Sequence, residues 1–299
     1  MAKRVLLVVT LFLASALISF GAHSQDRRVI PNARDCPHDH QQLYVPGGEF
    51  MMGSTPEERE YAYRLDRGVT RSYGWYEKET RKKVKTGGFC IDRYPVTNAQ
   101  YKRFMNETGH PEPYISPEAY QRQGFLVHPY AKVKEFLWGE GSFPPGRESH
   151  PVALVSLDDA TSYCAWKGKK KKRRYRLPTE AEWEKAARGT DGRIFPWGNE
   201  WNPDYLNSGD RFGSTTPVSR FPQGRSPYGL YDMVGNLFEW TATPWDKNSY
   251  VLKGCSWDDL PGTCRAAMRH GRPPQSKHIL IGFRCASDVG GLDLRKDAR

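Results

Sequence analysis

Six cysteines are the side chains of this sequence best suited to bind a soft metal or to carry redox chemistry. Cys255 and Cys264 lie nine positions apart, and their thiolates could together hold copper or iron. The alternative is an ordinary disulfide, because an even number of cysteines in an exported chain predicts disulfide bonds. The two cysteines would then pair with each other or with Cys36 and Cys90.

Two carboxylates, Asp232 and Glu239, lie seven positions apart on either side of a glycine turn at Gly235. Calcium prefers several hard oxygen ligands at about 2.3–2.6 Å, supplied by carboxylates and carbonyls together. The stretch is therefore a candidate structural calcium site. The alternative is a polar turn in which short polar side chains bond to their own backbone.

The histidines give weaker signals. His270 and His278 could act as acid or base, but single histidines more often pack in the interior or lie at the surface. Cys36, His38 and His40 resemble a metal cluster by composition. They lack the paired spacing of a zinc site, so we favour no metal there.

Residues 169–174, KKKKRR, form the strongest run of charge in the chain. Such a run can contact phosphate or an acidic surface, but we expect a solvated loop between two helices. Aromatic residues are not interleaved with it, apart from the following Tyr175. We therefore infer no nucleic-acid binding from it.

The composition is that of a globular chain with many turns. Its 299 residues can bury a sizeable core as one large domain or two ordinary ones. With 38% hydrophobic and 26% charged residues and a formal charge of +11, it is not a polytopic membrane protein. Nine Trp, 16 Tyr and 13 Phe argue against wholesale disorder, while 28 Gly and 22 Pro predict few long helices.

The first 24 residues have the features of a secretory signal peptide. Lys3 and Arg4 precede a mostly apolar run at residues 5–20, and small residues follow it up to Ser24. We expect the mature chain to be exported to the periplasm or the extracellular space. The alternative is an uncleaved membrane anchor, although the run is shorter than the roughly 20 residues of a spanning helix.

The elements that must position the candidate residues are short. Capping signals and helical spacing of apolar residues predict three helices, at 97–108, 156–167 and 179–188. We expect strands within 44–54, at 89–94 and in short pieces beyond 194, with surface loop and some helix at 57–83 and a long ordered loop at 111–149. One domain at 44–288 would follow a loose leader at 25–43 and precede a tail at 289–299.

Ten motifs follow one another in a recognisable order from residue 45 to residue 286. They are VPGGEFMMGS at 45–54, CIDRYPVTNAQYKRF at 90–104, HPVALVSLDDATSYCAW at 150–166, RLPTEAEWEKAARG at 176–189, FPWGNEW at 195–201, TTPVSRFP at 215–222, GLYDMVGNLFEWT at 229–241, LKGCSW at 252–257, CRAAMRHGRPP at 264–274 and GFRCA at 282–286. On these motifs the chain resembles the formylglycine-generating, or sulfatase-modifying factor, family.

The resemblance implies a fold and a disulfide. The fold is α+β and C-type-lectin-like, rich in loops, with three short helices and short antiparallel strands. The disulfide is between Cys164 and Cys285. A second disulfide of the family is lost in both halves, because Ala187 and Ala266 occupy its positions.

The resemblance also implies an activity that the local residues do not support. Known members oxidise a cysteine of sulfatases to formylglycine with copper held by two cysteine thiolates. Alignment places Asp259 and Pro261 at those two positions, whereas Ser256 and Arg269 match the family. Other relatives carry out different oxidative work or bind ligands without chemistry, so the fold does not decide the function.

The expected ligand pocket lies near this segment. By resemblance it would bind a peptide or a small molecule without the usual copper chemistry, and its residues would be Ser256, Trp257, Arg265, Arg269 and His270.

Calcium ligands follow from the same resemblance. In the first loop Asp232 and Glu239 would give side chains and Gly235 and Leu237 carbonyls. In a second loop the ligands would be the side chains of Asn207 and Asp210 and the carbonyls of Ser208 and Phe212. Both ions would be structural.

Three functions from different classes remain. The first is an exported, calcium-stabilised binding domain of this family. The second is an oxygen-dependent oxidoreductase that uses Cys255 and Cys264 with copper or iron, or a mechanism without cysteine. The third is a structural protein that interacts with surfaces. Stoichiometric copper or iron with oxygen uptake would select the second.

Overall fold

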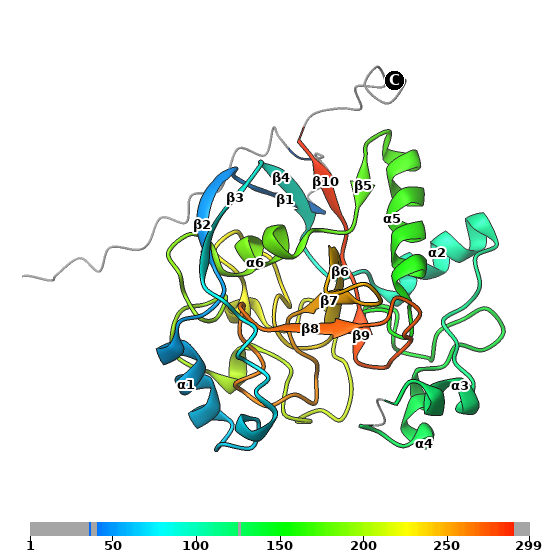
Figure 1. The fold of residues 1–299 in the computed structure, drawn as a ribbon. Helices are drawn as coiled ribbons and strands as arrows, with labels where there is room; N and C mark the ends of the chain where they lie inside the picture. The colour runs from blue at the N-terminus through cyan, green and yellow to red at the C-terminus, as the bar shows by residue number, and fades with distance from the viewer. Residues whose placement is uncertain (1–35, 37–40, 125–126, 290–299) are drawn as a thin grey trace, which may run out of the picture.

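Three small sheets are joined by helices and long loops, so the chain has the α+β architecture that the sequence predicted (Figure 1). The computed structural model describes residue 36 and residues 41–124 and 127–289. The expected signal peptide at 1–24, residues 37–40 of the cysteine–histidine cluster and residues 290–299 of the tail lie outside these residues. No helix in the described part of the chain combines the length and the apolarity that crossing a membrane requires.

The first sheet joins the two ends of the described chain. Its order is β1 (Gln42–Val45), β4 (Phe89–Asp92), β10 (Ala286–Asp288) and β5 (Tyr175–Arg176), with all neighbours antiparallel. All four residues of β4 are buried, because this strand lies between β1 and β10. The expected start of the domain at Tyr44 falls inside β1 rather than before it.

Of the other two sheets, one lies beside α6 and the other near the centre of the molecule (Figure 1). An antiparallel pair is formed by β2 (Gly48–Met52) and β3 (Lys82–Thr86). The central sheet has the order β8 (Arg269–Arg272), β7 (Tyr250–Lys253), β6 (Phe238–Pro244) and β9 (Ile281–Gly282). Here β6 and β9 run parallel, an exception to the predicted antiparallel pairing.

Three helices are confirmed close to their predicted bounds: α2 (Asn98–Thr108), α5 (Leu157–Lys171) and α6 (Glu180–Arg188). Each begins with a capping box, whose cap residue is Thr97, Ser156 or Thr179. α5 continues through Lys171, so the first half of the basic run is helical and the prediction of a loop there is wrong. Cations are favourable at this end of a helix because the carbonyl dipoles point toward it.

Further short helices lie where the sequence patterns are weak. α1 (Pro56–Leu65) starts with a capping box at Thr55, in a stretch where some helix was expected. The prediction of an uninterrupted loop over 111–149 is wrong, because α3 (Pro117–Arg122) and α4 (Tyr130–Val133) form there. Helices of four to six residues are too short to show a period. Single 3₁₀ turns complete the fold at Arg71–Tyr73, Lys134–Phe136, Pro203–Tyr205 and Pro222–Gly224.

Two disulfides secure the first sheet. The predicted bond between Cys164 and Cys285 is present and ties α5 to the residue before β10. A bond between Cys36 and Cys90 ties the leader to β4, so the leader is attached at this point and is not loose throughout. Both bonds close long stretches of chain, 121 and 54 residues.

Candidate functional site

Cys255 and Cys264 are bonded to each other. Their sulfur atoms are 2.02 Å apart, their Cα atoms are 4.9 Å apart, and both side chains are fully buried. Gly254, at a φ of +78°, turns the chain from β7 into this segment, where a Cβ atom would lie 3.2 Å from the carbonyl oxygen of Met233. Of the pairings left open by the sequence, the structure therefore has the local one, which offers no pair of thiolates to a metal.

Asp259 and Pro261, at the positions aligned with the family's copper-binding cysteines, shape the turn between the two bonded cysteines. The Asp259 carboxylate accepts hydrogen bonds from the backbone N–H of Ser256 at 2.7 Å and from its hydroxyl. The Pro261 carbonyl accepts from the backbone N–H of Cys264. Burial, followed by the nearby Asp258 carboxylate, raises the pKa of Asp259 to about 7.

Three of the five residues predicted for the ligand pocket are buried. Ser256, Trp257 and Arg265 are each at most 1% exposed. The two terminal nitrogens of the Arg265 guanidinium donate to the Glu79 carboxylate at 2.7 and 2.8 Å, so its charge is neutralised in the interior. A charge held in this way is not available to a ligand.

Trp257 is fixed in the same interior. Its ring stacks on His128 at 4.7 Å between centroids, and Phe136 lies beyond. His128 in turn contacts the Asp258 carboxylate at 2.8 Å.

The remaining two predicted pocket residues lie on β8 and are half-buried. Arg269 donates to both oxygens of Glu180, at 2.7 and 2.9 Å, and lines a cavity of about 120 Å³ together with Glu184. His270 lies against Phe238 at 6.0 Å between ring centroids. Burial lowers the pKa of His270 to about 3, so it is neutral at pH 7 and has no proton to give as an acid.

His278, the other candidate acid or base, is part of the apolar interior. It is 1% exposed and stacks on Tyr120, whose hydroxyl lies 3.1 Å from its Nε2 atom. A packing role accounts for these contacts.

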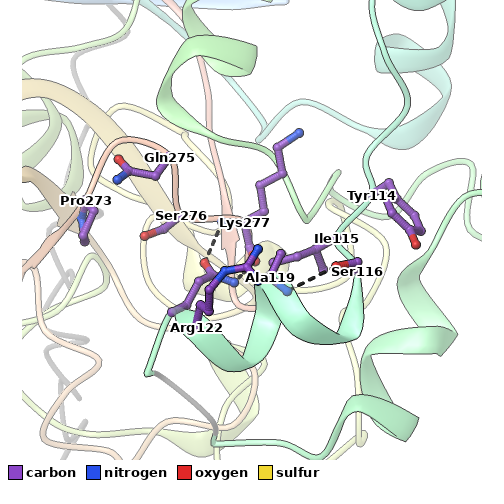
Figure 2. A pocket seen from close by; sticks show the side chains of 10 residues that line it. Tyr114, Ile115, Ser116, Ala119, Arg122, Pro273, Gln275, Ser276 and Lys277 are labelled. Carbon is purple, nitrogen blue, oxygen red and sulfur yellow. Dashed lines mark hydrogen bonds between the residues drawn. The ribbon is translucent and has the colours of Figure 1, made fainter.

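A larger pocket lies between α3 and the loop that follows β8, where sequence reasoning placed no site. It encloses about 640 Å³, and Figure 2 shows side chains from both segments around it. The residues that line it are Tyr114, Ile115, Ser116, Ala119, Arg122, Gln123, Pro273, Gln275, Ser276 and Lys277. The missed signal was the Ser116–Pro117 pair, since serine at the cap and proline at the first position predict a helix start. The Ser116 hydroxyl does cap α3, by accepting from the backbone N–H of Ala119.

The two walls of this pocket are held together by side-chain bonds to the backbone. Gln123 donates to the carbonyl of Lys277 at 3.0 Å and accepts from its N–H at 2.9 Å. The Lys277 ammonium contacts the Asp159 carboxylate at 2.9 Å, so its charge is partly neutralised. Arg122 is exposed and forms no ion pair within 4 Å to another described residue, which leaves its guanidinium as the pocket's open cation.

Comparison with known proteins decides the family. The family model described as "Sulfatase-modifying factor enzyme 1-like domain" matches residues 27–289. The chain belongs to the sulfatase-modifying factor family. It is 34% identical over 291 residues to the mouse (Mus musculus) "Inactive C-alpha-formylglycine-generating enzyme 2", covering 84% of this chain and 87% of that protein.

Other members of the family are similarly related. The mouse "Formylglycine-generating enzyme" is 34% identical over 298 residues, covering 82% of this chain and 74% of that protein. Among solved structures, that of PvdO from Pseudomonas aeruginosa superposes with a TM-score of 0.64 and 26% identity, covering 86% of this chain and 96% of that one. The chain is equally identical, at 34%, to the relative named as an enzyme and to the relative named as inactive, so sequence identity does not decide between the two.

The two loops expected to bind calcium contact each other through Asn236. Its side-chain amide donates to the Asp232 carboxylate at 3.0 Å, and its carbonyl oxygen accepts from the Asn207 side chain at 3.2 Å. Gly235, at a φ of +85°, allows this approach, because a Cβ atom there would lie 2.7 Å from the Asn207 carbonyl oxygen. The sequence predicted neither contact.

The oxygens proposed as calcium ligands differ in how far they are already used. The Asn207 side-chain oxygen is buried and has no hydrogen-bond partner among the described residues. Asp232 accepts from Asn236, and burial raises the pKa of Asp232 to about 7. The Glu239 carboxylate, by contrast, accepts from Arg284 at 2.6 and 2.7 Å and from Trp183 at 2.8 Å.

The other expected ligands are less suited to calcium. The Gly235 carbonyl accepts from the N–H of Leu237, and the Ser208 carbonyl accepts weakly from Arg211 at 3.4 Å. Asp210 is exposed, and Phe212 is half-buried. Within the described residues no three His, Cys, Asp or Glu side chains form a cluster able to hold a metal. Among the proposed ligand side chains, the Asn207 oxygen is the one that is buried without a hydrogen bond in the described part of the chain.

Proposed function

We propose that this chain is an exported, ligand-binding member of the sulfatase-modifying factor family that does not carry two-thiolate copper chemistry. The observation that carries the proposal is the buried disulfide between Cys255 and Cys264. Copper(I) is a soft ion that needs thiolate ligands, and a sulfur already bonded to sulfur is not a thiolate. Asp259 and Pro261 supply no sulfur in place of the pair.

Export is supported by the redox state of the chain. All six cysteines are paired in disulfides, which persist in oxidising compartments and are rare in the cytosol. The basic and apolar residues at 1–24 match a secretory signal peptide.

The binding site of the proposal is the pocket between α3 and residues 273–277. Its volume of about 640 Å³ lies within the roughly 300–1,000 Å³ of small-molecule sites. The bonds between Gln123 and the Lys277 backbone hold both walls in place before a ligand arrives, which reduces the entropy cost of binding. The exposed guanidinium of Arg122 suits a carboxylate, as in a short peptide.

A peptide-display selection tests this assignment. Random heptapeptides selected on the wild-type protein should bind Ala119→Trp, which fills the pocket, and Arg122→Gln at least tenfold more weakly. The matched control is Lys134→Gln, an exposed cation on the neighbouring segment that does not line the pocket. Equal binding of the selected peptides to wild type and to Ala119→Trp would contradict the pocket assignment.

The oxidase alternative is tested separately. The protein is incubated with copper(I), oxygen and a cysteine-containing sulfatase peptide, and aldehyde formation and oxygen uptake are measured. We expect neither above the rate of the Cys255→Ala, Cys264→Ala double variant. Turnover by the wild type alone would favour the oxidoreductase, and turnover by both proteins would favour chemistry without cysteine.

Calcium is part of the proposal as a structural ion. Support comes from the unpartnered Asn207 oxygen and the buried Asp232 carboxylate, both oxygen donors of the kind that calcium prefers. Glu239 could contribute only by sharing its carboxylate with Arg284. When bound, the ion would neutralise buried negative charge and join the two loops.

A further inference from the structure

The six basic residues at 169–174, which we name the basic tip, form a defined structure at the end of α5. Lys169 to Lys171 occupy the last turn, and Lys172 ends the helix in the left-handed conformation at a φ of +51°. Its backbone N–H bonds to the carbonyls of Gly168 and Lys169. Arg173 and Arg174 then lead into β5. Five of the six side chains are exposed, and Arg173 is half-buried.

Among the described residues, acidic side chains contact only part of the basic tip. Glu107 contacts the Lys170 ammonium at 2.6 Å. Asp288 contacts Arg174 at 4.0 Å but lies closer to Arg176, at 2.9 Å. Lys169 and Lys172 have no acidic group within 4 Å among the described residues. The tip therefore presents a surplus of positive charge to its surroundings.

Stability of α5 does not account for this number of cations. Positive charge favours the C-terminal end of a helix, but the effect fades within the last turn. Lys172 and Arg174 lie at or beyond that end. Clustered like charges on one exposed surface also repel one another, so the run costs stability unless a partner takes up the charge.

The structure also brings the ends of the described chain to the basic tip. Arg173 donates to the sulfur of Cys90 at 3.5 Å, and Cys90 is bonded to Cys36. The Arg173 Nε atom donates to the carbonyl of Asp288, in the last strand, at 2.9 Å. Figure 1 shows β10, β5 and the end of α5 side by side at one end of the molecule. The apolar run at residues 5–20 therefore precedes, by a short stretch of sequence, a residue fixed beside the tip.

We propose that the basic tip binds the surface of an anionic phospholipid bilayer. Lys169 lines a cavity beside α2, but the exposed cations of the tip are spread along the helix end beyond it, which matches an extended negative surface rather than a single phosphate group. The proposal is independent of the peptide pocket, which lies on α3 and residues 273–277.

Flotation with lipid vesicles tests the proposal. The purified protein is mixed with vesicles of phosphatidylcholine alone or of phosphatidylcholine with phosphatidylglycerol, at low and at high salt. We expect binding only to the anionic vesicles and its loss at high salt, because screening shortens the reach of charge to a few ångströms. The triple variant Lys169→Gln, Lys172→Gln, Arg174→Gln should partition roughly 100-fold more weakly.

A matched control removes the same charge from elsewhere. Arg67, Lys134 and Lys247 are exposed, form no ion pair with a described residue and lie away from the tip in sequence. The variant Arg67→Gln, Lys134→Gln, Lys247→Gln should keep wild-type binding, and unfolding curves should show that both variants fold. If both variants lost vesicle binding equally, net charge alone would explain the binding, and the proposal would be overturned. Wild-type binding to heparin without binding to vesicles would also overturn it, and would identify an acidic macromolecule as the partner.

Discussion

Cys255 and Cys264, which flank the segment that the sequence resemblance aligned with a copper site, are joined by a disulfide and are completely shielded from solvent. The backbone N–H of Gly235 lies 3.0 Å from the Cys255 sulfur, so the bond is also packed against the loop that precedes β6. The same segment has Asp259 in place of a thiol, hydrogen-bonded to Ser256. These contacts give the segment a structural role.

Removing this disulfide should lower stability moderately. It closes a loop of only nine residues, and the loss of loop-closure entropy predicts a cost of about 2.5 kcal/mol for Cys255→Ala, Cys264→Ala. The matched variant Cys164→Ala, Cys285→Ala opens a loop of 121 residues and should cost about 5 kcal/mol. Urea unfolding of both double variants measures the difference. A Cys255, Cys264 variant as stable as wild type would show that the bond does not form in solution.

Glu239 should be essential for stability through Arg284 whether or not calcium is present. Both side chains are at most 1% exposed and are joined by two hydrogen bonds. Glu239→Gln leaves a buried guanidinium without its counter-charge, which we expect to cost about 3–5 kcal/mol. Unfolding is measured in excess chelator so that no ion contributes. The exposed pair of Arg71 and Glu60 is the control, since Glu60→Gln should cost less than about 1 kcal/mol.

Calcium should raise the melting temperature of the wild-type protein relative to chelator, because an ion that binds only the folded chain stabilises it. Asp232→Asn and Asn207→Ala should remove most of this increment, whatever they do to stability in chelator. Asp246→Asn, at an exposed carboxylate that belongs to neither loop, should leave the increment intact. If the melting temperature of the wild-type protein were the same in calcium and in chelator, the proposal of a structural calcium ion would be wrong.

Stability should fall in acid partly through His150. Burial, and next the nearby Arg147, lowers the pKa of His150 to about 4 from an ordinary value near 6.5. Between these values the unfolded chain takes up a proton that the folded chain does not, so this contribution is complete above about pH 6.5 and is lost as the pH falls toward 4. Glu148 and Arg220 also act on the ring, and its Nδ1 atom contacts the Thr215 hydroxyl at 3.0 Å.

His150→Gln isolates this effect, because glutamine can keep a hydrogen bond to Thr215 but does not titrate. The free energy of unfolding of wild type should drop relative to the variant as the pH is lowered from 6.5 to 4, and the difference should be constant above 6.5. A difference that does not change with pH would exclude His150 as the source.

Local patterns predicted the helices of this fold well. The capping boxes at Thr97, Ser156 and Thr179 involve residues three positions apart, so the sequence contains both partners of each bond. The order of the motifs indicated the family and, through it, the disulfide between Cys164 and Cys285. The sequence did not predict α3 and α4, because helices of six and four residues are too short to show a hydrophobic period or an apolar face.

The candidate site was predicted less well because its determinants are distant in sequence. Arg265 resembles a ligand-binding cation until Glu79, 186 positions earlier, is seen to neutralise it in the interior. Glu239 resembles a free calcium ligand until Arg284 is seen to bind it. The large pocket is formed by α3 together with residues 273–277. The spacing of residues within either segment does not predict that the two segments lie together.

Alkylation of the native protein tests the central claim most directly. The folded chain is treated with iodoacetamide without reductant, and its intact mass and non-reduced peptide map are then recorded. The account predicts no adduct on Cys255 or Cys264 and a peptide in which these two residues remain linked. Alkylation of both cysteines in the folded protein would contradict the account. If prior addition of copper(I) prevented that alkylation, the result would favour a copper oxidase.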